Sequence, residues 1–217
     1  MKKVIFFGFL LSLTSTMAQA QWKVGVQAGY GQAWNFYDRE LPEGAEIDVP
    51  GYHLSAQAYY AITPWLSVGV EPGFVRRGAA CIPDWGPIFV GDTQWHLNYV
   101  SAPLMVQGSW PNIAGTGLRV FGSLGAGVSY RVGGFTRSVD LETGEVNGEI
   151  KFKDLFFPTP PTLWDAGAHT NLGLGIPVFG QELTVRAEYY HGLMDTSIDT
   201  TSKNRSLSVA IGYTFAL

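Results

Sequence analysis

The sequence has 217 residues, of which 27 are glycine, 14% are aromatic and only 15% are charged, against about 25% charged residues in a typical soluble domain. Its mean hydropathy of +0.08 is too low for a bundle of membrane-spanning helices and too high for a disordered chain. The 14 basic and 18 acidic residues provide no excess of positive charge, so the composition argues against nucleic-acid binding.

The first 20 residues have the features of a secretory signal peptide. Two lysines precede a short apolar run over 4–13, and an A-x-A cleavage pattern ends at Ala20. This apolar run is shorter than the roughly 20 residues that a spanning helix needs. We therefore predict that the signal peptide 1–20 is cleaved after export and that 21–217 forms one domain. Cys81 is the only cysteine, so disulfide bonds do not hold this domain together.

From Trp22 onward, apolar and polar residues alternate with the period of two that is typical of half-buried β-strands. One face of each run carries Leu, Val, Ala and aromatic residues, and the other carries Gly, Ser, Gln and a few charged residues. The pattern predicts an all-β domain of eight strands, at about 22–31, 52–62, 66–74, 96–108, 118–130, 164–176, 182–190 and 206–217.

The connections between these predicted strands alternate strictly in length. Short connections lie at 63–65, 111–117 and 177–181, whereas long ones lie at 33–51, 78–95, 132–163 and 194–204. This alternation is typical of an antiparallel up-and-down transmembrane β-barrel, which has short periplasmic turns and long outer loops. Aromatic residues near the predicted strand ends suit the two membrane interfaces. We expect both mature termini in the periplasm.

A soluble eight-stranded barrel of the lipocalin type is the competing fold, because it is also up-and-down. Alternation alone does not decide which face points outward. In a soluble barrel the polar face would be outside and the apolar face inside, so the direction of the faces separates the two folds.

Four segments carry a family resemblance. The segment Val185–Asp195 resembles the "RY-x-x-GL-x-D" signature of PorT-like outer-membrane β-barrel proteins, although Glu188 stands in place of the arginine. The segment Leu97–Gln107 is similar to that family's "Y-x-x-x-P-L-L-x-K" strand, with Ser101 where an acidic residue is common and Gln107 in place of the basic one. Matching residues in these and the other two segments, "D-x-G" and "G-Y-x-F", are Tyr99, Pro103, Leu104, Asp165, Gly167, Tyr189, Gly192, Leu193, Asp195, Gly212, Tyr213 and Phe215.

The resemblance implies an eight-stranded barrel of the Gram-negative outer membrane that contacts outer-membrane lipid and is inserted by the outer-membrane assembly machinery. It does not imply one function, because such families include porin-like proteins, adhesin-like proteins and accessory parts of secretion systems.

Six charged residues are predicted to point into the barrel, namely Lys23, Glu71, Arg119, Asp165, Arg186 and Glu188. The lumen of an eight-stranded barrel is only wide enough to be filled by side chains. Charges of both signs in so narrow a space are expected to pair with one another, because an unpaired buried charge is costly. The pairs would form either a structural plug that fixes the strand register or a gate that controls ion leak.

The longest predicted loop contains an apolar, proline-rich segment at 152–162. Its residues Leu155, Phe156 and Phe157 would form either a docking strip for a protein partner or a lid over the barrel mouth.

The predicted function is that of an integral outer-membrane protein, porin-like or structural, with a narrow lumen and surface loops. The alternative is an accessory subunit of a secretion or surface-assembly complex that binds its partner through the outer loops. An outer-membrane enzyme built on His169 or His191 would need a nucleophile beside its base, and the sequence pattern provides none. We expect no catalytic site, no cofactor and no metal site.

Overall fold

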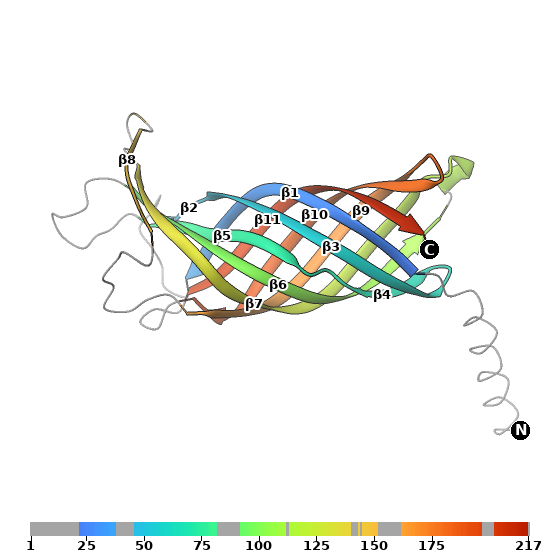
Figure 1. Ribbon diagram of the computed structural model, residues 1–217, viewed down its shortest axis with the longest axis horizontal. Coiled ribbons are helices and arrows are strands. Elements are labelled where there is room, and N and C mark those ends of the chain that lie inside the picture. The colour runs from blue at the N-terminus through green and yellow to red at the C-terminus, as the bar shows by residue number, and fades with distance from the viewer. Residues whose placement is uncertain are drawn as a thin grey trace, which may run out of the picture.

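The computed structural model describes residues 22–37, 46–81, 92–111, 113–139, 143, 145–151, 162–196 and 202–216. The signal peptide and the apolar loop segment with Phe156 and Phe157 lie outside these residues. The described chain forms one long barrel of tilted strands (Figure 1). The strands are β1 (Trp22–Tyr37), β2 (Glu46–Ile47), β3 (Val49–Thr63), β4 (Leu66–Val70), β5 (Gly73–Cys81), β6 (Asp92–Trp110), β7 (Arg119–Val139), β8 (Val146–Lys151), β9 (Trp164–Val178), β10 (Gln181–Asp195) and β11 (Ser202–Ala216).

The wall of the barrel has eight positions, as the sequence predicts. Going round the ring, β1 pairs with β3, β4 and β5 together fill the next position, and β6, β7, β9, β10 and β11 follow. The pairing of β11 with β1 closes the ring, and all of these pairings are antiparallel. Closure leaves no unpaired strand edge in the wall, which is the condition for β-structure inside a bilayer.

The apolar face of the strands points outward. Leu104 on β6 and Leu124 on β7 are 67% and 68% exposed, whereas the neighbouring inward side chain of Gln107 is only 6% exposed. A soluble barrel requires the reverse arrangement, so the lipocalin-like alternative is wrong. The outward surface is the lipid-facing surface of a transmembrane barrel.

Two belts of aromatic side chains bound this apolar surface. Trp22, Trp65 and Trp110 are exposed at the end that carries the short turns. At the other end, Tyr52 stacks on Phe74, and the rings of Tyr130 and Trp164 lie 4.9 Å apart. On β1, Trp22 lies in the first belt and Tyr30 in the second. The nine residues from one to the other match the roughly 9–11 residues that a tilted strand needs to cross a bilayer.

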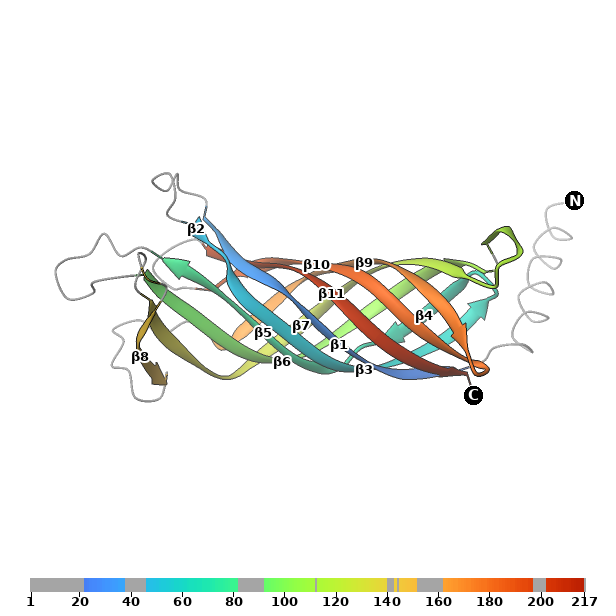
Figure 2. The same ribbon diagram turned by 90° about the horizontal axis from the view of Figure 1, so that it is seen from above.

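The strands continue well beyond the second belt, and here the predicted boundaries are wrong. Strand β1 extends to Tyr37 and β7 to Val139, so the predicted long loops begin later than expected. The predicted loop 132–163 also contains β8, which pairs with the end of β7. Figure 2 shows β2 and β8 at the end of the barrel opposite the short turns. The sequence signal fades there because these strand ends lack the regular apolar face that lipid imposes.

The predicted third strand, 66–74, is interrupted between β4 and β5. Pro72 has no backbone N–H and cannot donate to a continuous ladder. Bonds to neighbouring strands keep the wall closed at this point, from the Ala56 N–H to the Pro72 carbonyl at 2.9 Å and from the Glu71 N–H to the Pro103 carbonyl at 3.1 Å.

Inward glycines make room for large inward side chains on the adjacent strand. A Cβ on Gly69 would lie 2.6 Å from the ring of Tyr59, and a Cβ on Gly167 would lie 2.6 Å from the ring of Tyr190. These close approaches account for part of the high glycine content. None of the helical segments among the described residues is long and apolar enough to span a membrane.

Candidate functional site

The lumen is filled by polar side chains that form three clusters along the barrel. We call them the turn-end cluster (Lys23, Gln107, Arg119, Glu182), the central cluster (Gln27, His53, Gln57, Tyr59, Glu71, Arg186, Glu188, Ser208) and the loop-end cluster (Arg77, Tyr99, Ser101, Ser129, Asp165, Tyr190, Asn204). The side chains of Arg77 and Asp165 are both 1% exposed, and those of Arg186 and Glu71 are 3% and 7% exposed. These charges are therefore removed from bulk water and depend on one another for compensation.

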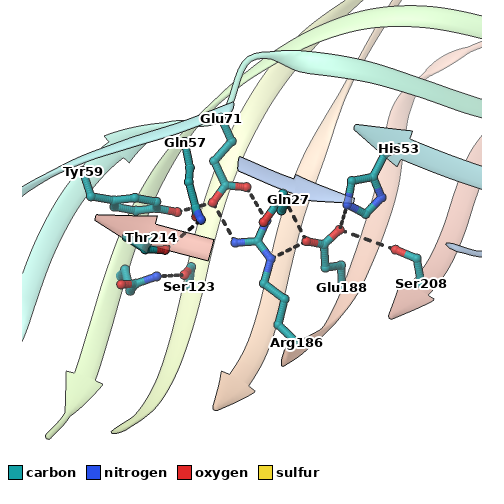
Figure 3. A network of polar contacts seen from close by, with 11 residues as sticks. Gln27, His53, Gln57, Tyr59, Glu71, Ser123, Arg186, Glu188, Ser208 and Thr214 are labelled. Atoms are coloured by element: carbon teal, nitrogen blue, oxygen red, sulfur yellow. Dashed lines mark hydrogen bonds and ion pairs between the residues drawn. The ribbon is translucent and has the colours of Figure 1, made fainter. Parts of the chain in front are cut away.

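The central cluster is organised around Arg186 on β10 (Figure 3). Its guanidinium donates to both carboxylate oxygens of Glu71, at 2.8 and 2.6 Å, and its Nε donates to Glu188. Tyr59 donates its hydroxyl to Glu71 at 2.5 Å, and His53 Nε2 lies 3.1 Å from Glu188. One arginine thus ties together two carboxylates, each held by a further partner.

Glu71 and Arg186 come from opposite sides of the ring. Glu71 lies at the junction of β4 and β5, and three ring positions lie between this junction and β10 in either direction. The bidentate pair between them therefore crosses the lumen instead of running along one wall.

The loop-end cluster is built on Asp165 of β9. Arg77 Nη1 lies 3.2 Å from Asp165 Oδ2, and Asn204 Nδ2 donates to the same oxygen at 2.9 Å. The guanidinium of Arg77 also lies 3.5 Å from the centre of the Tyr190 ring, which is the geometry of a cation–π contact. Asn204 further approaches the Tyr99 hydroxyl at 3.4 Å. This pair is a second crossing of the lumen, nearer the loops, between β5 and β9.

The turn-end cluster pairs Arg119 with Glu182. Two guanidinium nitrogens of Arg119 donate to the two carboxylate oxygens of Glu182 at 2.8 and 2.5 Å, and a third donates to Gln107 at 3.1 Å. Lys23 lies within electrostatic range of both Arg119 and Glu182. This cluster lies in the lumen beside the short turns, and its ion pair links β7 to β10 past β9.

All six predicted lumen residues are in these clusters, but the sequence did not show which ones meet. Glu71, Arg186 and Glu188 come together, whereas Asp165 and Arg119 have partners that the prediction lacked. Arg77 was missed because the third strand was expected to end at Phe74, and Glu182 because it lies beside a turn. Continuing the period of two beyond Phe74 would have placed Arg77 inside.

A cavity of about 70 Å³ lies between the central and loop-end clusters. One buried water needs about 10–15 Å³ of this kind of volume, so the cavity has room for only a few waters. Its lining includes Gln27, Ser55, His169 and Asn171, each with a buried polar atom that has no hydrogen-bond partner among the described residues. The cavity suits ordered water and is too small for a drug-sized ligand.

The two histidines considered for an enzyme do not converge. His169 faces the lumen and its ring lies 4.8 Å from that of Tyr190, whereas His191 is on the outward face of β10 beside Tyr189. Among the described residues, no group of three or more His, Cys, Asp or Glu side chains is arranged to hold a metal ion.

Comparison with known proteins agrees with this architecture. The outer membrane protein OprG from Pseudomonas aeruginosa aligns with 90% of this chain and 95% of its own at 10% identity, with a TM-score of 0.50. Ail of Yersinia pestis aligns with 89% of this chain and 98% of its own at 15% identity, with a TM-score of 0.45. No curated protein sequence matches the chain.

The likeness to OprG shows the fold alone, and the family comes from a separate match. Residues 7–215 match the family described as "Outer membrane protein beta-barrel domain". The chain belongs to this outer membrane protein β-barrel family, and it is an integral outer-membrane protein with a narrow, side-chain-filled lumen and loops at one end.

Proposed function

We propose that the protein is a closed barrel that anchors and presents its loop end at the cell surface, and that it is not an open diffusion channel. The observation that carries this proposal is the bidentate Arg186–Glu71 pair across the lumen. A second crossing, Arg77–Asp165, lies in the loop-end cluster, and the Arg119–Glu182 pair of the turn-end cluster runs along the wall between β7 and β10, which both pair with β9. Of the two predicted roles for the lumen charges, this favours the structural plug over the gate.

The proposal includes an orientation. The start of β1 and the end of β11 lie at the same end as the short turns (Figure 1). In outer-membrane barrels the short turns are periplasmic, so both mature termini would be periplasmic and β8 would lie outside the cell. A Gly148→Cys variant, made with Cys81→Ser, should react with a membrane-impermeant maleimide on intact cells. Labelling only after the outer membrane is opened would contradict this orientation.

Planar-bilayer conductance of the refolded mature protein tests the plug. The wild type should show no steady conductance, and Arg77→Ser/Arg186→Ser should show discrete openings because it removes both side chains that cross the lumen. Arg205→Ser, at an outward-facing position, is the matched control and should remain silent. Steady wild-type conductance would overturn the proposal, as would a silent Arg77→Ser/Arg186→Ser barrel whose unboiled gel mobility is native.

We further propose a PorT-like barrel, because residues of the family's motifs meet in the loop-end cluster. Tyr99 and Asp165 share Asn204 as a hydrogen-bond partner, and Gly167 admits the ring of Tyr190. In this proposal the motifs encode the packing of one cluster. Replacing Asp165 should therefore lower the free energy of unfolding of the barrel.

An accessory role in a secretion or surface-assembly complex is the second candidate. The extension of β6 and β7 beyond the second aromatic belt favours it, because this extension carries the connecting loops away from the lipid. Replacing Phe156 and Phe157 by Ser should then abolish co-purification of a partner while gel mobility stays native. Unchanged co-purification would exclude this segment as the docking strip.

A further inference from the structure

A positively charged patch lies on the outward face of the barrel, at and beyond the second aromatic belt. It is centred on Phe135 of β7, whose ring has three neighbours. The guanidinium of Arg76 lies 5.0 Å from the ring centre, that of Arg137 lies 5.4 Å from it, and the His96 ring stacks on it at 4.6 Å. Two cations are thereby held beside one another on a rigid aromatic support.

Arg76 is held at the level of the lipid interface. Its guanidinium lies 4.5 Å from the centre of the Tyr52 ring in the second belt, and its Nε donates to Asn98 at 3.0 Å. Interfacial tyrosines mark the depth at which lipid headgroups begin. Arg137 lies further from the membrane along β7 and is partly exposed. The two guanidinium groups therefore lie at headgroup depth and just beyond it.

The ion pairs of the described residues balance the charge of this patch only in part. In the described part of the chain, no carboxylate forms an ion pair with Arg76, and Arg137 has a single partly exposed partner, Glu149, at 3.2 Å. Lys151 is in register with Phe135 and adds a third positive charge on the same face. Arg77, Arg119 and Arg186 in the lumen all have carboxylate partners. The patch thus lacks the compensation found for the inner arginines.

We propose that Arg76 and Arg137 bind the phosphate groups of a phosphorylated glycolipid headgroup in the outer leaflet. Guanidinium groups bind phosphate through paired, charge-assisted hydrogen bonds, and the aromatic supports limit the freedom that binding must remove. The choice of leaflet rests on the proposed orientation. Binding of the phosphorylated headgroup does not depend on that orientation. The maleimide labelling on cells, which tests the orientation, and the lipid-binding measurement, which tests the site, can therefore fail independently.

The test uses the refolded mature protein in neutral detergent and native mass spectrometry. The probes are lipid A with both phosphates, the same lipid without phosphates, and inorganic phosphate. The wild type should bind the diphosphoryl lipid about thirtyfold more tightly than the dephosphorylated one, as expected for two interfacial arginines. Arg76→Gln/Arg137→Gln should lose this preference.

Arg205→Gln is the matched control, because Arg205 also lies over an aromatic ring, that of Phe36 at 4.0 Å, but outside the patch. It should keep the preference. The proposal is overturned if the wild type binds both lipids equally, if Arg205→Gln loses the preference to the same extent, or if the double variant keeps it. If inorganic phosphate at the same concentration as the lipid displaces the diphosphoryl lipid completely, the site binds a free anion and the proposed lipid binding is overturned. Native unboiled gel mobility of each variant verifies that it is folded.

Discussion

Arg186 and Glu71, 115 residues apart in the sequence, face each other across the lumen and form two hydrogen bonds of 2.8 and 2.6 Å. The pair joins strands on opposite sides of the ring, and each side chain compensates the buried charge of the other. Arg186 also contacts the carboxylate of Glu188. Tyr59 holds the carboxylate of Glu71 in place, and His53 and Gln27 hold that of Glu188. The central cluster is therefore a structural cross-brace.

Glu71→Gln should strongly destabilise the barrel. The substitution leaves the Arg186 charge buried with one carboxylate fewer, and breaking a buried pair in this way costs about 3–5 kcal/mol. The free energy of unfolding in urea, measured in lipid vesicles, tests this. The control Glu149→Gln breaks a partly exposed pair with Arg137 and should cost at most about 1 kcal/mol. Equal losses for the two variants would refute the brace.

The Arg77–Asp165 pair should show strong non-additivity. Arg77→Met and Asp165→Leu each leave one buried charge alone and should each lower the unfolding free energy by about 3–5 kcal/mol. The double variant removes both charges and should be more stable than either single variant. A double-mutant cycle on vesicle unfolding measures this coupling, and simple addition of the two losses would disprove it.

Gly69→Ala should destabilise the barrel although alanine is better tolerated in strands than glycine. The added Cβ would lie 2.5 Å from the Ala58 carbonyl oxygen and 2.6 Å from the Tyr59 ring. Overpacking of this kind costs about 1–3 kcal/mol. Gly108→Ala is the control, because a Cβ there would have nothing within 4 Å. The temperature at which the folded gel band disappears should fall for the first variant only.

Leu104→Arg should be costly in lipid because Leu104 lies on the outward face, between the two aromatic belts. An arginine at the bilayer midplane of such a barrel costs about 2–4 kcal/mol, and the cost falls to about 0–1 near the interfaces. Val132→Arg, which replaces an exposed side chain beyond Tyr130 of the second belt, is the control and should be nearly neutral. Similar losses at both sites would contradict the assigned lipid-facing band.

The sequence alone determined the eight positions of the wall, the residues on each face of the predicted strands and six of the lumen charges, without Arg77 and Glu182. These features are local: successive side chains on a strand point to opposite sides, so the period of two already separates Arg186 and Glu188 from Val185 and Ala187. Short turns such as 63–65 are likewise set by neighbouring residues. A period of two does not say which face of a strand points out of the barrel. The closed ring, with its apolar face exposed and its polar face buried, decides this.

The tertiary structure also decided the partners. Which charges meet across the lumen depends on the order of strands round the ring and on their stagger, and neither follows from the alternation within any one strand. Arg186 meets Glu71 and Arg77 meets Asp165 for this reason. The alternation in the sequence also did not predict the extension of β6 and β7 beyond the lipid. The outer ends of these strands are held by pairing with each other and lack the apolar face that lipid imposes.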